Sequence, residues 1–428
     1  MKKFSLVLLF VALALFTNAQ SISKIINASD VKRIESILSS DSMQGRKAFT
    51  AGSEKAAVFI GNEFKKIGLG TLNGLSGYSQ AFTMVSPKLI NISATIDSSV
   101  IDAKNVIPFT TAASLHITDK SGFRKTVLKA GAQFRKEIGA YLKFKENLIV
   151  FVDTSFAQNF TRLNRMRQQL FKSEKSVVFV LGTFAADRYD INITQELTEQ
   201  QGSNVVAVIP GKSKKDEIVV FSGHYDHLGI GKVNNNDSIY NGANDDASGI
   251  TAVIEMAKYY KAANKNERTL VFAAFTAEEI GGYGSQYFSK QLDPDKVVAM
   301  FNIEMIGTES KWGKNSAYIT GFEKTDLGKI LQKNLQGSSF SFYPDPYTDQ
   351  NLFYRSDNAT LALLGVPAHT ISTSKMDSEA NYHKLSDEVN TLDLNNMTEV
   401  IKSVIISAKS IVNGKDTPSR VKADELTR

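Results

Sequence analysis

The sequence contains no cysteine, and this absence narrows what the protein can be. Without thiols the chain has no disulfide bonds, no thiolate metal ligands and no cysteine that could carry a lipid anchor. Any transition metal must therefore be held by histidine, aspartate and glutamate. Histidine is itself scarce, with five residues in 428. Each histidine that stands in a short polar motif is therefore informative.

Long apolar runs are also lacking, except for one at the N-terminus. It covers Phe4 to Phe16, follows Lys2 and Lys3, and precedes a short stretch that ends at Ala19. This order is typical of a cleaved signal peptide, and the run is short for a membrane span. We therefore expect residues 1–19 to be removed, with no integral membrane segment left. The mature protein would then be periplasmic or extracellular.

The chain has no strong excess of charge. Its formal net charge is +6, and the removal of Lys2 and Lys3 lowers this to +4. Between residues 119 and 175, 13 lysines and arginines outnumber 5 aspartates and glutamates, but no nucleic-acid-binding motif accompanies them. We expect a solvated basic surface and no nucleic-acid partner, with attraction to anionic envelope polymers as the alternative.

Strands and helices alternate from about residue 203. Apolar, β-rich segments at 217–222, 269–275 and 297–303 are separated or followed by amphipathic helical patterns, such as 247–262 and 394–411. This alternation predicts an α/β fold, with three αβα layers around a mostly parallel central sheet.

Residues 85–200 have a different pattern. Short β-branched runs alternate there with basic, polar connections, and one helix is expected near 160–171. We therefore predict an inserted, mostly β domain at 85–200 that interrupts a larger domain formed by residues 20–84 and 201–428. His116 stands alone in the insertion, and we expect it to be an ordinary surface or core residue.

The first motif that suggests chemistry lies at the end of the strand 217–222. His224 follows this strand and supplies a nitrogen ligand suited to zinc. Asp226, two residues on, is well placed to hold the other imidazole nitrogen and to orient the ring. His227 competes as a ligand, although its position next to Asp226 favours a place in the pocket wall.

The second motif contains Asp245 and Asp246, just before the helix 247–262. A carboxylate at this position has two oxygens and can bridge two cations. Acidic residues also cap helix N-termini, so capping by Asp245 or Asp246 is the simpler explanation when this motif is taken alone.

Three further glutamates complete the acidic set. Glu278 and Glu279 follow the strand 269–275; beside a metal, one can ligate while its neighbour accepts a proton from water. Glu304 ends an otherwise apolar strand, where an unpaired charge is costly to bury. It needs a metal or an arginine, with Arg268 and Arg355 as candidates.

Together with Tyr382 and His383 in a polar loop, these motifs resemble the co-catalytic zinc exopeptidase family of secreted bacterial leucyl aminopeptidases and glutamate carboxypeptidase. The resemblance extends over the segment 42–46 and from about residue 204 to the end. It implies two zinc ions, with cobalt or manganese as substitutes, bridged by one carboxylate, and a shared water that Glu278 deprotonates. It also implies a β insertion like a protease-associated domain, which we expect to restrict access to the site. The implied metal ligands are His224, Asp245, Glu279, Glu304 and His383, with Asp226 and Tyr382 in supporting roles.

The motifs also depart from the family at three positions. Many relatives have Asp where Glu304 stands, Asp instead of Asn244, and His instead of Asn358. We expect peptide substrates and cleavage at the N-terminus. The alternatives are a carboxypeptidase of the same family, a glutaminyl cyclase-like transferase, and a binding protein that has kept the fold without activity. The intact Glu278 argues against the last of these.

Overall fold

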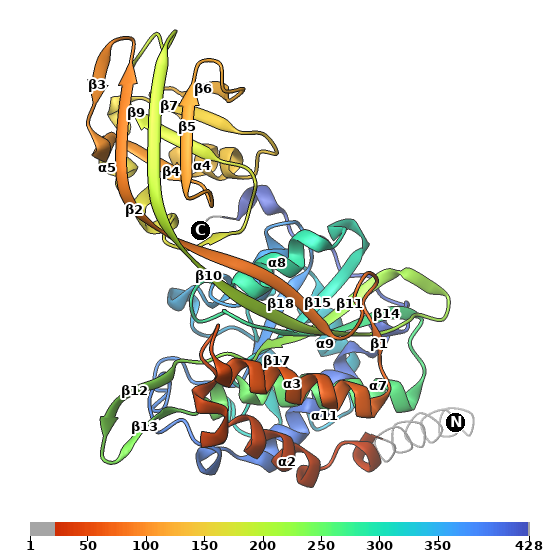
Figure 1. Cartoon of the computed structure of the whole chain (residues 1–428). Helices are drawn as coiled ribbons and strands as arrows, with labels where there is room; N and C mark the ends of the chain where they lie inside the picture. Colours follow the sequence, from red (N-terminus) through yellow and green to blue (C-terminus); the bar gives the residue numbers. More distant parts are fainter. Residues whose placement is uncertain (1–21, 427–428) are drawn as a thin grey trace, which may run out of the picture. The chain divides into compact units, whose positions relative to one another are not determined.

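The structure is a computed structural model that describes residues 22–426. The expected signal peptide, residues 1–19, lies outside the described residues. The chain forms two compact units. Among the described residues, the core unit contains 22–81 and 202–426, and the inserted unit is Phe82–Gln201. Two long strands, β2 (Ser79–Ile96) and β10 (Tyr189–Ile209), contribute residues to both units (Figure 1).

The main sheet is parallel at its centre. The strand β11 (Lys214–His224) pairs in parallel with β14 (Arg268–Phe275) and with β15 (Val297–Ile303), and β15 pairs in parallel with β18 (Ala368–Ser372). Antiparallel pairs flank this centre, namely β10 with β14 and β16 with β18. The predicted mostly parallel central sheet is therefore confirmed. In sheet order, the strands are β17 (Ser341–Pro344), β16 (Ser316–Ile319), β18 (Ala368–Ser372), β15 (Val297–Ile303), β11 (Lys214–His224), β14 (Arg268–Phe275), β10, β2 and β3 (Ser99–Ile101).

Helices cover both faces of this sheet (Figure 1). Successive side chains of a strand point to opposite faces, so Phe221 belongs to one hydrophobic core and Val220 to the other. The Phe221 ring stacks on Phe272 and Phe301 of the two neighbouring strands. The three-layer αβα architecture follows. The helices on the Phe221 side are α2 (Ala28–Leu38), α3 (Ala51–Ile67), α7 (Ser248–Ala263), α9 (Leu327–Leu335) and α11 (Leu394–Val412), and those on the other side are α8 (Tyr283–Gln291) and α10 (Asn358–Ala362).

Local signals fix the ends of these helices. Before α3, the hydroxyl of Ser53 accepts a hydrogen bond from the Thr50 N–H, and the helix stops at Gly68 in the left-handed conformation (φ 76°). Asp393 caps α11 by accepting from the Asn396 N–H. Within residues 22–426, no helix is long and apolar enough to cross a membrane.

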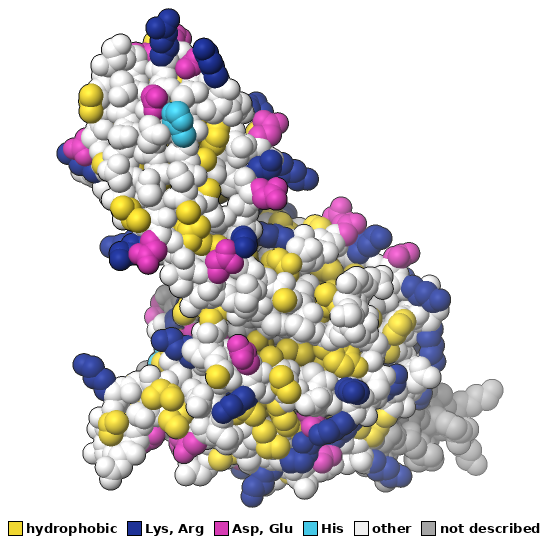
Figure 2. All heavy atoms as spheres, in the orientation of Figure 1, with side chains coloured by type: hydrophobic (Ala, Val, Ile, Leu, Met, Phe, Trp, Pro, Cys, Tyr) yellow, Lys and Arg dark blue, Asp and Glu magenta, His cyan; other side chains and the backbone are white. Residues whose placement is uncertain are grey.

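The inserted unit has a sheet of its own. The strand β7 (Leu148–Val152) pairs in parallel with β6 (Arg124–Leu128) and with β9 (Val177–Leu181), and β4 (Val106–Phe109) pairs antiparallel with β9 at the edge of the sheet. The lone His116 is exposed and pairs with Asp190. On the face drawn in Figure 2, the basic side chains of this unit stand among acidic ones. The strands of this sheet are β4 (Val106–Phe109), β9 (Val177–Leu181), β7 (Leu148–Val152) and β6 (Arg124–Leu128), with the helix α4 (Phe134–Leu142) between β6 and β7.

The helix predicted near 160–171 is wrong. The structure has two short helices, α5 (Ala157–Phe160) and α6 (Leu163–Met166), followed by the strand β8 (Leu170–Phe171), which pairs with β2. Leu163 is buried but Met166 is half exposed, so no continuous apolar stripe forms along this segment. The pairing with β2 therefore outweighs a weak helical pattern.

Candidate metal centre

The predicted site residues lie together at one edge of the central sheet. This edge is formed by the carboxyl ends of the parallel strands, where open α/β sheets place their binding sites. His224 is the last residue of β11, while two short loops after β14 and β15 carry the glutamates. Asp245 lies in the turn that leads into α7, and His383 in the loop between β18 and α11.

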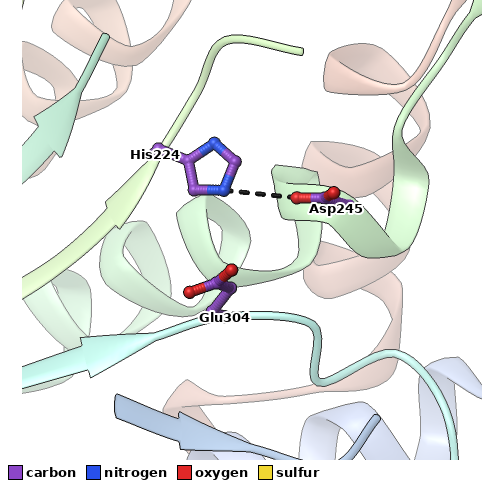
Figure 3. A group of neighbouring side chains, drawn as sticks. All are labelled: His224, Asp245 and Glu304. Atoms are coloured by element: carbon purple, nitrogen blue, oxygen red, sulfur yellow. Dashed lines mark ion pairs between the residues drawn. The ribbon is translucent and has the colours of Figure 1, made fainter. Parts of the chain in front are cut away.

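The first group of ligand atoms belongs to His224, Asp245 and Glu304 (Figure 3). The three donor atoms all lie within 4.8 Å of one another. Nε2 of His224 is 3.2 Å from Oδ1 of Asp245. This buried nitrogen nevertheless forms no hydrogen bond within the described part of the chain. A buried ring nitrogen that faces a carboxylate oxygen without bonding to it fits a cation that lies between the two atoms.

The other nitrogen of His224 is held by the main chain. Nδ1 lies 3.1 Å from the carbonyl oxygen of Asp226, while the Asp226 carboxylate is 3.8 Å away. That carboxylate instead accepts a hydrogen bond from the N–H of Glu278, at 3.1 Å. Asp226 therefore orients the ring through its backbone, which differs from the side-chain contact expected from the sequence. Its side chain links the β11 loop to the β14 loop.

A second group forms around the other oxygen of Asp245. Nε2 of His383 is 3.2 Å from Oδ2 of Asp245 and 3.2 Å from Oε2 of Glu279. His227 also belongs to this neighbourhood, because His227, Asp245 and Glu279 offer donor atoms within 4.8 Å of one another. Its Nδ1, however, forms a hydrogen bond of 2.7 Å with Oε1 of Glu279. His227 is thus already engaged with a carboxylate, whereas His383 is equally distant from two.

Asp246 and Asp387 hold the turn that carries Asp245. Asp246 accepts hydrogen bonds from the N–H groups of His224, Gly249 and Met305. It therefore caps the first turn of α7, and the capping explanation applies to Asp246 and not to Asp245. Asp387 accepts from the N–H groups of Asn244 and Asp245 through its two oxygens. The Asp245 side chain is left free to face the histidines.

Two supporting residues have roles that the sequence did not reveal. Asp387 stands four residues after His383, and an acid so close to a candidate ligand was the only signal of its role. Arg46 stands out in the sequence only as the last residue of the segment 42–46. It is fully buried and donates to the carbonyl oxygens of Tyr225, Asn241 and Gly242. It therefore ties the loop after β11 to the turn before α7.

Glu304 does not form the arginine pair that was its alternative explanation. Arg268 pairs with Glu217, and no ion pair joins Arg355 to Glu304 among the described residues. The Ser356 hydroxyl is its polar neighbour, and burial raises the pKa of Glu304 to about 7. Within residues 22–426, this carboxylate therefore forms no ion pair with a lysine or arginine, and its charged neighbour is His224.

Negative charge exceeds positive charge throughout the site. Burial raises the pKa of Asp226 to about 7 and that of Glu278 well above its usual range. The carboxylates of Asp245 and Glu279 accept hydrogen bonds from the His383 imidazole and raise its pKa to about 10. So many buried carboxylates are stable only with cations beside them. The acids in this cluster are Asp226, Asp245, Asp246, Glu278, Glu279, Glu304, Asp357 and Asp387.

A cluster of histidines and carboxylates at the carboxyl edge of an α/β sheet is the kind of site found in metallohydrolases. Residues 204–407 match the model of Peptidase family M28. This match covers just under half of the chain, and it confirms the resemblance to the co-catalytic zinc exopeptidases.

Individual relatives are peptidases as well. Aminopeptidase YwaD of Bacillus subtilis is 24% identical over 304 residues, which cover 65% of this chain and 61% of that protein. A Probable zinc metalloprotease of Pyricularia oryzae is 41% identical over 88 residues, or 21% of this chain and 17% of that protein. This chain thus spans less than two thirds of the length of either relative. Among solved structures, an aminopeptidase from Aneurinibacillus sp. strain AM-1 has a TM-score of 0.54 at 18% identity, covering 95% of this chain and 98% of that one, and so shares the fold.

Proposed function

We propose that this chain is an exported aminopeptidase that uses two zinc ions to remove single residues from the N-termini of peptides. The observation that carries the proposal is the position of Asp245. Its Oδ1 lies 3.2 Å from His224 and its Oδ2 lies 3.2 Å from His383. One carboxylate thus faces two histidines from distant segments, the end of β11 and the loop before α11, as a ligand that bridges two metal ions must.

The distances between side chains support a separate ligand set on each side of Asp245. Two ligand atoms of a tetrahedral zinc ion, with bonds of about 2.0–2.2 Å, lie about 3.3–3.6 Å apart. The 3.2 Å separations around His224 and His383 are close to this value. In the proposal, His224 and Glu304 hold one ion, Glu279 and His383 hold the other, and Asp245 is shared.

Glu278 is the proposed general base. When bound, the two ions would polarise the scissile carbonyl and lower the pKa of the attacking water. Glu278 accepts a proton from this water and later donates it to the leaving amine. Its side chain is partly buried, and desolvation raises its pKa, which suits both transfers. Tyr382 stands beside His383, with its ring stacked on the imidazole at 3.9 Å, and would donate a hydrogen bond to the oxyanion.

The charge of the site favours the N-terminus of a peptide over the C-terminus. A protonated α-amine is attracted by the acidic cluster, whereas an α-carboxylate is repelled by it. The aminopeptidase named among the relatives supports the same choice. Zinc is supported by the histidine and carboxylate donors and by the zinc metalloprotease relative. Cobalt and manganese fit the same donors.

A single experiment separates this proposal from its alternatives. The purified protein is incubated, with and without a chelator, with peptides that have free, acetylated or glutamine N-termini, and the product masses are read. We expect chelator-sensitive loss of residues from free N-termini only. Loss from C-termini would establish a carboxypeptidase instead, and loss of ammonia from glutamine a cyclase. No change in any peptide would overturn the peptidase proposal.

Metal content tests the two-ion arrangement independently. We expect two zinc ions per chain by elemental analysis, and fewer in Asp245→Asn, which removes the charge that would bridge them. Glu278→Gln is the matched variant, because it should keep both ions while losing turnover. His116→Gln changes an exposed histidine in the inserted unit and should keep both ions, so it controls for zinc lost during purification. Two ions retained by Asp245→Asn would contradict the bridging role.

A further inference from the structure

A small cavity of about 40 Å³ lies beside Glu304 in the core unit. Apolar side chains, including Met305 and Met376, form part of its wall, and hydroxyl groups such as that of Ser372 form another part. Tyr382 and Arg355 also line it. Because the cavity is contiguous with a proposed metal ligand, a residue whose amine or carbonyl lies at the metals can place its side chain here.

Arg355 is the one cationic side chain that lines this cavity. It forms no ion pair within residues 22–426. Its side-chain hydrogen bonds are long, at 3.4 Å to Oε1 of Gln350 and 3.4 Å to the hydroxyl of Tyr382. A guanidinium has five N–H donors in a planar fork that matches a carboxylate. Most of that capacity is therefore available to a ligand.

The acidic residues near the cavity do not bind the free N–H donors of the Arg355 guanidinium. Glu304 lines the cavity, but its charge belongs to a metal in the proposed site. Asp345, which does not line the cavity, accepts a hydrogen bond from the Tyr347 N–H, and Glu379 accepts one from Ser374. Asp377 accepts from the hydroxyl of its neighbour Ser378. Arg355 is left as the uncompensated charge that a substrate side chain meets.

We propose that Arg355 selects peptides whose N-terminal residue carries a side-chain carboxylate, so that aspartate or glutamate is released in preference to uncharged residues. The proposal rests on the aminopeptidase function proposed above. It assigns Arg355 a role in substrate recognition and none in the chemical step. An arginine that is merely solvated would leave the apolar part of the wall to select residues such as leucine or methionine.

The test compares one peptide series that differs only in its first residue. The series carries Asp, Asn, Glu, Gln, Leu or Lys at that position, and kcat/KM is measured for each. We expect Asp over Asn, and Glu over Gln, by on the order of 10- to 100-fold, the value of a hydrogen-bonded charge pair. In Arg355→Met the Asp/Asn ratio should fall to about one, mainly through KM. In Arg355→Glu the Lys peptide should become preferred to the Asp peptide.

Two comparisons isolate the guanidinium from other effects. Arg355→Lys keeps the charge without the fork and should retain part of the preference. Lys375→Met removes a nearby charge next to the cavity-lining Met376 and should leave the Asp/Asn ratio unchanged. Free aspartate should also inhibit the wild-type enzyme more strongly than it inhibits Arg355→Met. Because each ratio compares two substrates of one variant, a general loss of activity cancels.

The outcomes separate the two proposals. Release of leucine or methionine with no preference for acidic residues would overturn the role of Arg355 and leave the aminopeptidase function standing. An acidic preference that persists in Arg355→Met would also overturn it. No release from any free N-terminus would instead remove the proposed function on which this inference rests.

Discussion

Nδ1 of His227 lies 2.7 Å from Oε1 of Glu279, and both side chains are almost completely buried. This hydrogen bond occupies one oxygen of Glu279, while its other oxygen lies 3.2 Å from His383. The pair therefore separates two roles that the sequence left open. Glu279 and His383 point toward the same proposed metal position, and His227 orients Glu279 through a hydrogen bond to its other oxygen.

The first prediction concerns these two histidines. We expect His227→Ala to weaken zinc binding by about 10- to 100-fold, the effect of losing a residue that orients a metal ligand. His383→Ala should remove one ion altogether, because it deletes a proposed ligand. Zinc titration of the metal-free variants, read by elemental analysis, distinguishes the two. Loss of a full ion in His227→Ala but not in His383→Ala would reverse the assignment.

A second prediction uses two glycines in helices. A Cβ added at Gly249, in the first turn of α7, would overlap the carbonyl oxygen of Ile303 and the Asp246 carboxylate. Gly249→Ala should therefore displace the residues on either side of the metal centre, lowering both zinc content and melting temperature. At Gly61, in α3, the nearest atom is 3.9 Å away. Gly61→Ala should be neutral or stabilising by up to about 1 kcal/mol.

These paired variants are compared by thermal unfolding with and without added zinc. If Gly249→Ala bound zinc as tightly as Gly61→Ala does, the close packing of α7 against the end of β15 would not be what positions the site.

Much of the core unit could be predicted from the sequence because its signals are local. Apolar strands such as 269–275 and 297–303 are buried on both faces and read as continuous hydrophobic runs. The residues that follow them must meet at one edge once the strands are parallel. His224 and Glu304 could therefore be grouped from the sequence alone, although their binding of a metal stays a prediction.

Contacts between distant segments could not be predicted in this way. Asp387 holds the N–H group of Asp245 across 142 residues, and nothing in the local sequence specifies that pairing. The Nδ1 partner of His224 depends on how the backbone turns after β11, so the sequence suggested the carboxylate of Asp226 where the structure uses its carbonyl. The segment 160–171 was misassigned because its pairing with β2 depends on a strand that lies far away in the chain.

The third prediction concerns metal removal. Without cations, the buried carboxylates around Asp245 repel one another, so a chelator should lower the melting temperature of the protein. Added zinc should restore it, since a ligand that binds only the folded state at 1,000 times its Kd stabilises by about 4 kcal/mol. Glu278→Gln should show the same recovery, because the proposed base is not a ligand. A melting temperature that does not respond to chelator or zinc would contradict the metal centre itself.

The last prediction concerns Glu35, which is completely buried in α2. One of its oxygens accepts a hydrogen bond of 2.8 Å from Thr251 and the other has no hydrogen-bond partner among the described residues. Burial raises the pKa of Glu35 to about 8 from an ordinary value of 4.5. The folded protein therefore keeps this proton between pH 4.5 and 8 while the unfolded chain loses it, so this group lowers stability as the pH rises through that range. Glu35→Gln keeps an oxygen for Thr251 and cannot ionise. We expect its melting temperature to equal that of the wild type near pH 4.5 and to exceed it increasingly up to about pH 8.

Glu63→Gln is the control with the opposite sign, because hydrogen bonds from Arg33 and Lys66 outweigh burial and lower the pKa of Glu63. That variant should be less stable than the wild type above the ordinary pKa of glutamate. An advantage of Glu35→Gln that does not grow with pH would show that Glu35 is not the titrating group.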